Sequence, residues 1–524
     1  MNAKMVRWAL GVWALVALPL ALFAAASGPQ VKTASGTVEG KEDGGVKAFL
    51  GIPYAAPPVG NLRWKPPMPP AGWDGVRKAT DFGSHCMQGK VYGDMSFRDP
   101  GGSEDCLTLN VWVPTKTAGA KLPVMVWIYG GGFVAGTTSE ARQDGTHLAQ
   151  QGVIVVSMNY RLGVFGFFVH PELAKESGRN AAGNYGLLDQ VAALRWVHDN
   201  IAAFGGDPGN VTIFGESAGS FSVSAQMASP LAKGLFQKAI GESGGAFYSG
   251  GLSFEPRSER EEKDVKVVST KLGVSTLAEL RAVPAQKLLD AFSPPQSQGF
   301  DFGPDVDGYF LPEPVPAIFA AGKQNDVPLL AGWNHDEGSF EIAFSPLKPT
   351  ADSLQATAQK EFGDKSAEFL RLYPSATPEQ ALRSAQDFAG DRFIAFSTWQ
   401  WMDSQSKTGK HPIYRFRFDL GPPADPNGPQ LGAFHSAEIE YVFGQLDSKA
   451  GVAWKSEHRE LSETMQKYWA NFARSGDPNG PGLPKWPVYS AADGWPVMFL
   501  DAKSEARKDE LRDRYLFLAA AWAK

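Results

Sequence analysis

The 524-residue sequence predicts an α/β fold in which helices flank a mostly parallel central sheet. Two nearly continuous apolar runs, at residues 122–129 and 153–160, are typical of strands that are buried on both faces of such a sheet. A segment of helical periodicity and a further strand follow them along the chain. This alternation of strands with helices indicates α/β layering.

Helical periodicity is clearest between Gly186 and Gly205, where apolar residues recur mostly at every third or fourth position. Glycine commonly ends helices, so the pair Gly205-Gly206 predicts the end of this one. Residues 207–210 have the composition of a turn, and the β-branched segment 211–214 predicts a short strand directly after it.

Composition places the chain among globular proteins, because 43% of its residues are hydrophobic and only 20% are charged. The net charge is -6 and no basic stripe is present, so nucleic acid is not an expected partner. The sequence contains no internal repeat, low-complexity tract or long linker. We therefore expect a single domain with large insertions at residues 27–524, and the sequence does not assign its oligomeric state.

The N-terminal residues have the layout of a secretory signal peptide. Lys4 and Arg7 precede an uncharged apolar run at residues 8–26 that ends in small residues. An uncleaved anchor is the alternative, since 19 residues can span a bilayer, but Pro19 and the alanine cluster favour cleavage. We expect removal of residues 1–26, which changes the net charge from -6 to -8 and gives an exported protein, periplasmic or secreted, with no stable membrane anchor.

The chain contains two cysteines, Cys86 and Cys106. An even pair in an exported protein predicts a disulfide, which on the chain-entropy model stabilises the fold by about 3 kcal/mol. Two unrelated buried thiols are the alternative. A metal site is disfavoured, because the sequence has no CxxC motif and no histidine cluster.

The predicted strand at 211–214 leads directly into Gly215-Glu216-Ser217-Ala218-Gly219. The pattern G-x-S-x-G forms the nucleophile elbow of an α/β-hydrolase only where a strand precedes it and a helix follows, and residues 220–229 can form that helix. The serine of an elbow lies on a strained turn, where residues larger than glycine would clash. This context predicts that Ser217 is a nucleophile.

A second segment, Gly241-Glu242-Ser243-Gly244-Gly245, also fits the pattern. It follows a possible strand, but the glycines after Ser243 are a poor start for a helix. We therefore expect Ser243 to be a structural residue or one that supports the reacting residues without touching the substrate.

A glycine-rich segment, Tyr129-Gly130-Gly131-Gly132-Phe133, follows the first predicted strand. An ester that is attacked by serine develops negative charge on its carbonyl oxygen, and backbone N–H groups must already point at that oxygen. Glycine lets the backbone approach a substrate closely, so this segment is the predicted oxyanion loop, with the N–H of Ala218 as a further donor. An ordinary flexible loop is the alternative.

Three of the eight histidines lie far enough downstream to be the base. His458 lies in a charged helical stretch, where we expect it to be solvated, and His411 opens an alternating strand. His435 lies in a loop that contains glycine, and catalytic residues lie disproportionately on loops. Position therefore favours His435, with activity rising through an ionisation at about pH 6–7.

The acid that orients the histidine should follow a strand between the nucleophile and the base. Residues 327–332 predict such a strand, and the turn after it contains both Asp336 and Glu337. Either carboxylate would hold the imidazole tautomer and stabilise the imidazolium. Spacing does not choose between them.

Taken together, the motifs resemble those of the type-B carboxylesterase and cholinesterase family of α/β-hydrolases, and the resemblance covers nearly all of the chain after residue 26. The set of ordered motifs is far more specific than any one of them. The motifs are GIPYAAPPVG at 51–60, SEDCLTLN at 103–110, YGGGF at 129–133, NYR at 159–161, FGGDP at 204–208 and FGESAG at 214–219.

The resemblance implies roles for particular residues. The family's acid is the glutamate of the segment that reads NHDEGSF at 334–340, which favours Glu337 over Asp336. Ser243 matches a serine that hydrogen-bonds near the triad. The implied site consists of the triad Ser217, Glu337 and His435 and the oxyanion donors Gly131, Gly132 and Ala218. The implied structural pairs are the disulfide Cys86–Cys106 and the ion pairs Arg63–Glu104 and Arg161–Asp189, for which four solvated charges are the alternative.

On this resemblance the chain is expected to hydrolyse small-molecule carboxylic esters through an acyl-serine intermediate, without a metal or other cofactor. Amide or carbamate hydrolysis with the same residues, and a non-catalytic binding protein of the same fold, are the alternatives. Cholinesterases carry in the disulfide loop a tryptophan that binds a quaternary ammonium group, whereas residues 87–105 contain none, so choline esters are disfavoured and bacterial general carboxylesterases are the better match. Aromatic residues that line the pocket or pack in the core are expected at 247–252, Phe300, Phe302 and 340–344.

Overall fold

The computed structural model describes residues 28–117, 121–247, 254–293, 301–346, 348–424 and 428–523. The predicted signal peptide lies outside the described residues. Within the described ranges, no helix is both long enough and apolar enough to cross a membrane.

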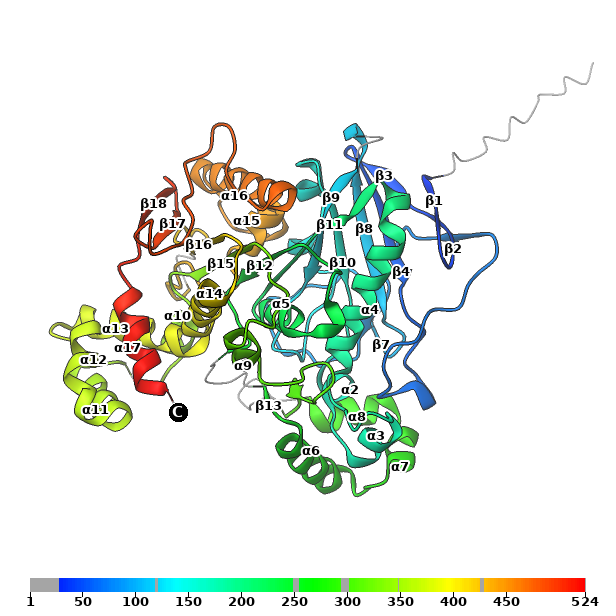
Figure 1. Ribbon diagram of the computed structural model, residues 1–524, viewed down its shortest axis with the longest axis horizontal. Helices are drawn as coiled ribbons and strands as arrows, with labels where there is room; N and C mark the ends of the chain where they lie inside the picture. The colour runs from blue at the N-terminus through cyan, green and yellow to red at the C-terminus, as the bar shows by residue number, and fades with distance from the viewer. Residues whose placement is uncertain are drawn as a thin grey trace, which may run out of the picture.

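In the described part of the chain, 11 strands form one sheet at the centre of the molecule (Figure 1). All neighbours from β17 to β10 are parallel, whereas the strands at the two edges are antiparallel. The order across the sheet is β18 (Glu505–Lys508), β17 (Pro496–Leu500), β16 (Ile413–Phe418), β15 (Leu329–Asn334), β12 (Lys238–Glu242), β11 (Gly206–Glu216), β9 (Leu122–Ile128), β10 (Ile154–Met158), β8 (Thr108–Pro114), β4 (Val46–Pro53) and β3 (Lys41–Asp43). The prediction of a mostly parallel sheet is confirmed.

Helices cover both faces of this sheet (Figure 1). The helix α16 (Ser456–Ser475) packs on β9 and β11, and α4 (Tyr185–Asn200) and α5 (Ala218–Ala228) pack on β11 from the other side. Every residue of β9 and β10 is buried, which explains why their sequences are nearly continuous apolar runs rather than alternating ones.

The helix that was predicted between Gly186 and Gly205 is α4 followed by one 3₁₀ turn (Ile201–Phe204). Gly205 ends it with a φ of +88°, a left-handed conformation that favours glycine. The prediction of a separate turn at 207–210 is wrong, because β11 already begins at Gly206. Those residues instead interrupt the pairing of β11 with β9, whose register shifts between Gly206 and Val211.

The remaining elements surround these layers, and some of them also pack on the sheet. The other helices are α1 (Thr146–Gln150), α2 (Gly163–Phe167), α3 (Pro171–Glu176), α6 (Arg257–Leu272), α7 (Leu277–Ala282), α8 (Ala285–Phe292), α9 (Val315–Ala320), α10 (Ser339–Ala343), α11 (Ala351–Phe362), α12 (Ser366–Leu372), α13 (Pro378–Gly390), α14 (Phe396–Thr408), α15 (Ile439–Phe443) and α17 (Arg512–Trp522). The other strands are β1 (Gln30–Thr33), β2 (Gly36–Glu39), β5 (Val76–Lys78), β6 (His85–Cys86), β7 (Gly102–Ser103), β13 (Glu255–Pro256) and β14 (Asp305–Val306). Examples of elements that pack on the sheet are α14 on β15 and α1 on β8 and β10.

A disulfide joins Cys86 to Cys106, so the alternative of two unrelated thiols is wrong. Both implied ion pairs are also present. Two charge-assisted hydrogen bonds of 2.6 Å join Arg63 to Glu104, and two of 2.8 and 2.7 Å join the buried side chains of Arg161 and Asp189. These four charges are therefore paired in the fold rather than solvated.

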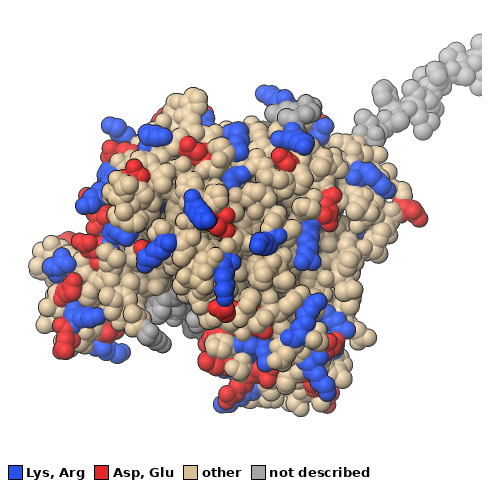
Figure 2. Space-filling view, in the orientation of Figure 1, with Lys and Arg blue, Asp and Glu red and all other residues tan. Residues whose placement is uncertain are grey.

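Acidic and basic side chains are interspersed on the face of the molecule that Figure 2 shows. No continuous basic stripe crosses that face, which agrees with the acidic net charge of the chain.

Candidate active site

Ser217 lies on the tight turn between the end of β11 and the start of α5. Its φ is +54°, in a region that residues other than glycine rarely adopt. A Cβ on Gly215 or Gly219 would lie 2.6 or 1.9 Å from the carbonyl oxygen of Ile128 in β9. Glycine at both positions therefore lets the turn and α5 pack against the neighbouring strand.

Ser243 lies at the end of β12, the next strand of the sheet. Its φ of +52° is as strained as that of Ser217, but residues 244–247 after it are not helical. The Ser243 hydroxyl instead donates a hydrogen bond of 2.5 Å to Oε1 of Glu337. Backbone strain thus does not distinguish the two G-x-S-x-G segments, whereas the helix that follows Ser217 does.

Glu337 and His435 are 98 residues apart in sequence and meet beyond the carboxyl ends of β15 and β16. Oε2 of Glu337 lies 2.7 Å from Nδ1 of His435. Oε1 accepts hydrogen bonds from the hydroxyl of Ser243 and, at 2.8 Å, from the backbone N–H of Asn334. Because both oxygens are held, the carboxylate has a fixed orientation toward the imidazole.

Asp336, the other candidate acid, faces a different group. Its carboxylate pairs with Arg383 at 2.5 Å and accepts the backbone N–H of Ala433 at 2.9 Å. Burial raises the pKa of Asp336, but His335 and Arg383, which hydrogen-bond to its carboxylate, lower the pKa by more. The net pKa of Asp336 therefore lies below its ordinary value. The structure therefore engages Asp336 in holding its own loop and directs Glu337 to His435.

The two other downstream histidines lie away from this site. His411 is exposed and precedes β16, as its sequence predicted. The expectation that His458 is solvated is wrong, because only 3% of it is exposed and its ring packs 5.6 Å from that of Trp454. His458 lies on the inner face of α16, and the charged residues around it lie on the outer face.

The glycine-rich loop after β9 passes directly beside the nucleophile. A Cβ on Gly130 would lie 3.0 Å from the Cβ of Ser217. Gly131 and Gly132 have φ values of +107° and +63°, and among the described residues their N–H groups have no hydrogen-bond partner. The N–H of Ala218, the first residue of α5, also has no acceptor within its helix. These three donors are free to bind an oxyanion.

A cavity of about 200 Å³ contains Ser217, His435 and the glycine-rich loop in one wall. Phe393 contributes another wall, and its ring meets that of His435 edge-on at 4.9 Å. The aromatic segments expected from the sequence do not line this cavity where they are described. Phe247 and Phe302 are buried in the core, Phe340 and Phe344 are exposed, and residues 248–252 and Phe300 lie outside the described residues.

Glu216, between the first glycine of the elbow and the nucleophile, is buried with its Oε1 at 3.2 Å from Nε2 of His435. In the described structure the Ser217 hydroxyl makes no hydrogen bond, so Glu216 is the polar neighbour of Nε2 in this state. Arg142 lines the same cavity and pairs with Glu140 at 2.6 Å.

Burial and the neighbouring charges shift the ionisations of this site strongly. Burial lowers the pKa of His435, but the carboxylates of Glu216 and Glu337 raise it more, so that its pKa lies at about 9 rather than in the range of 6–7 expected from sequence. Burial raises the pKa of Glu216 to about 7, although His435 and Arg142 act against this rise. The imidazolium form of His435 is therefore stabilised by two carboxylates.

Sequence reasoning assigned no role to several residues of this cavity, among them Glu216, Arg142 and Phe393. Glu216 carried a usable signal, because it is a charged residue inside the elbow motif itself. Arg142 and Phe393 carried none, since each reaches the cavity from a segment without a motif. In the part of the chain that the structure describes, no cluster of three or more His, Cys, Asp or Glu residues has the arrangement to hold a metal ion.

Comparisons with known proteins agree with this geometry. A family profile described as "Carboxylesterase family" matches residues 27–517. The chain is 39% identical to para-nitrobenzyl esterase of Bacillus subtilis (strain 168), over 88% of this chain and 92% of that one, and 36% identical to fumonisin B1 esterase of Sphingopyxis macrogoltabida, over 87% and 84%. Among solved structures, a thermophilic PNB esterase aligns with a TM-score of 0.80 and 38% identity, over 93% of this chain and 99% of that one.

Proposed function

The chain belongs to the carboxylesterase family and is a carboxylic ester hydrolase, and on this premise we propose that Ser217, His435 and Glu337 carry out the hydrolysis. The observation that carries the proposal is the contact of 2.7 Å between His435 and Glu337 in a cavity that also contains Ser217. Small-molecule esters are the substrates that the family implies.

In the proposed mechanism, Nε2 of His435 accepts the proton of the Ser217 hydroxyl as its oxygen attacks the ester carbonyl. This requires the serine hydroxyl to turn toward Nε2, where Glu216 is now the polar neighbour. The resulting imidazolium is stabilised by Glu337, whose orientation depends on the hydroxyl of Ser243. The protonated histidine then gives its proton to the leaving alcohol, and an acyl-Ser217 ester remains.

Negative charge develops on the former carbonyl oxygen during this attack, and we assign its stabilisation to the N–H groups of Gly131, Gly132 and Ala218. Two observations support this role: these N–H groups have no hydrogen-bond acceptor among the described residues, and the glycine-rich loop lies beside Ser217. In the second half of the reaction, His435 removes a proton from water, whose oxygen attacks the acyl group. The acyl–serine bond then breaks, His435 returns the proton to the Ser217 oxygen, and the acid is released.

Replacing the nucleophile tests the mechanism. We expect Ser217→Ala to lower kcat toward p-nitrophenyl butyrate by about 10⁵-fold or more, as removal of a triad serine does. Ser243→Ala is a matched control, because it removes the serine of the other G-x-S-x-G segment and costs about tenfold through one lost hydrogen bond. Labelling by a fluorophosphonate at Ser243 rather than Ser217, or a Ser217→Ala protein with full activity, would refute the assignment.

The disulfide supports a location outside the reducing cytoplasm. We further propose export with cleavage after residue 26, to the periplasm or the medium. The mass of the N-terminal peptide of the purified native protein tests this, and a peptide that retains residues 1–26 would contradict it.

A further inference from the structure

The disulfide Cys86–Cys106 closes a loop, residues 87–105, that forms part of the wall of the catalytic cavity. We call it the disulfide loop. Its residues Tyr92, Asp94 and Met95 line the same cavity as the glycine-rich loop. The proposed mechanism assigns no role to the disulfide loop, although the volume of the cavity depends on where this wall lies.

Met95 contacts the glycine-rich loop inside the cavity. A Cβ on Gly131 would lie 3.3 Å from Cε of Met95, so the methionine packs against the glycine that we assign as an oxyanion donor. Methionine is unbranched and flexible and fills irregular gaps. Its position beside Gly131 therefore depends on how firmly the backbone of the disulfide loop is held.

The apolar contact between the two loops is small. Val91, Val134 and Ala135 form a buried cluster that is separate from the main core, and Tyr92 and Met95 pack against it. Hydrophobic stabilisation grows with the apolar area that is buried, so a cluster of this size holds a loop only weakly. Polar contacts supply the rest of the attachment.

Asp99 makes the largest set of these polar contacts, and its side chain is only 1% exposed. Its Oδ1 accepts hydrogen bonds from Nδ1 of His85 at 2.7 Å and from the backbone N–H of Gly101 at 3.0 Å. Its Oδ2 accepts the buried hydroxyls of Ser139 at 2.5 Å and Thr137 at 3.2 Å. One carboxylate oxygen thus bonds within and beside the disulfide loop, and the other bonds to the segment 136–139, which follows the glycine-rich loop along the chain.

Gln88 attaches the other end of the disulfide loop to the same segment. Its side chain donates a hydrogen bond of 2.8 Å to the carbonyl oxygen of Gly136 and accepts one of 2.8 Å from the N–H of that residue. The stretch between Gln88 and Asp99 carries Met95. Two polar attachments to one short segment therefore fix the stretch that places Met95 against Gly131.

We propose that Asp99 is a positioning residue for ester hydrolysis, and that Met95, which it holds beside Gly131, limits the size of the ester that the cavity accepts. Pockets for drug-sized ligands have volumes of about 300–1,000 Å³. The catalytic cavity has about 200 Å³, so one side chain in its wall changes the available volume by a large fraction. The protein is then selective for short esters. This inference rests on the proposed function, because it concerns the wall of the same site.

The specificity for chain length tests the proposal. The value of kcat/KM is measured for one pair of esters that differ in the acyl group, p-nitrophenyl acetate and octanoate, and for one pair that differ in the alcohol, ethyl and octyl acetate. We expect the wild-type protein to prefer the short member in at least one pair. In that pair, Met95→Ala should raise the relative kcat/KM of the long member at least about tenfold.

Two substitutions of Asp99 separate its position from its charge. Asp99→Ala removes all four hydrogen bonds and should shift the same ratio in the same direction as Met95→Ala. Asp99→Asn should stay within about threefold of the wild-type ratio, because its amide oxygen can replace Oδ1 and its NH₂ group can donate to two hydroxyls that accept as well as donate. If Asp99→Ala does not fold, Gln88→Ala removes the other attachment and takes its place.

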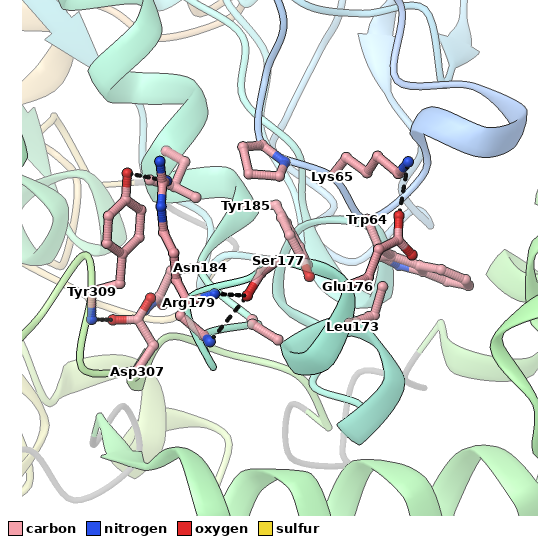
Figure 3. A pocket seen from close by; sticks show the side chains of 15 residues that line it. Trp64, Lys65, Leu173, Glu176, Ser177, Arg179, Asn184, Tyr185, Asp307 and Tyr309 are labelled. Carbon is pink, nitrogen blue, oxygen red and sulfur yellow. Dashed lines mark hydrogen bonds and ion pairs between the residues drawn. The ribbon is translucent and has the colours of Figure 1, made fainter.

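Each alanine variant has a matched control. Leu173→Ala removes an apolar side chain from the wall of a separate cavity of about 230 Å³, which shares no lining residue with the catalytic one (Figure 3). Asp326→Ala removes a carboxylate that bonds to Gln405 and to the N–H of Lys410, before the amino end of β15. Neither control should change the ratio.

Labelling of Ser217 by a fluorophosphonate separates this inference from the proposed function. A labelled Ser217 together with unchanged ratios in Met95→Ala or in Asp99→Ala would overturn this inference alone, whereas a wild-type Ser217 that is not labelled would overturn the proposed function. A shift in Asp99→Asn as large as that in Asp99→Ala, or an equal shift in Asp326→Ala, would also overturn the positioning role.

Discussion

Glu216 sets the pH at which the proposed base becomes active, and we expect Glu216→Gln to move that pH downward. Oε1 of Glu216 lies 3.2 Å from Nε2 of His435, and two unit charges at this distance attract each other by about 5 kcal/mol at an effective dielectric constant of about 20. One pKa unit corresponds to about 1.4 kcal/mol. Because the pKa of Glu216 is itself raised to about 7, its side chain is only partly ionised near neutral pH, and only part of this attraction acts there. We therefore expect Glu216→Gln to lower the pKa of His435 by at least about one unit.

The sign follows from the protonation state that the reaction needs. His435 accepts a proton only when it is neutral, and its pKa of about 9 means that kcat/KM falls as the pH drops below that value. Glutamine removes a negative charge that stabilises the imidazolium, so neutral histidine persists to lower pH. The acidic limb of the pH profile therefore moves to lower pH in the Glu216→Gln protein.

The assay is kcat/KM for p-nitrophenyl butyrate from about pH 5 to 10, with spontaneous hydrolysis subtracted. Glu242→Gln is the matched control, since Glu242 is a buried carboxyl of the neighbouring strand whose pKa burial raises to about 8 and which bonds to Trp469. Glu242 is not among the largest causes of the shift in the pKa of His435, so we expect the profile of the Glu242→Gln protein to move by less than about 0.3 unit. Profiles of the two variants that coincide would refute the reasoning.

Three further outcomes are expected. Replacing both Cys86 and Cys106 by serine should lower the free energy of unfolding by about 3 kcal/mol in urea, and an unchanged midpoint would contradict the assigned bond. Arg161→Met should cost about 3–5 kcal/mol in the same assay, because it leaves a buried carboxylate unpaired, whereas Arg507→Met at the surface should leave the unfolding midpoint nearly unchanged. Ser243→Ala should lower kcat more than it changes KM for p-nitrophenyl butyrate, and a change confined to KM would place the serine in substrate binding.

Local patterns determined much of this protein. The run at 122–129 predicted a buried strand because a strand that is covered on both faces must be apolar at nearly every position, and β9 is buried throughout. The strand, the tight turn and the helix around Ser217 are neighbours in sequence, so one short motif specifies all three. The disulfide followed from there being only two cysteines to pair.

Only the tertiary structure showed which way each side chain points and which residues far apart in sequence meet. Asp336 and Glu337 are adjacent in one turn, and only the packing of that turn sends one to Arg383 and the other to His435. His458 was misjudged because a charged stretch of sequence does not show which face of a helix packs on the core.

The electrostatics of the site were decided by the same packing. Burial brings Glu216 and Glu337 to opposite nitrogens of one imidazole, although Glu337 is separated from His435 by 98 residues. The register of the parallel strands sets this meeting, because their carboxyl ends lie at one edge of the sheet. Sequence thus determined which chemical groups the site has available, and tertiary packing decided which of them touch and how strongly they shift one another's pKa.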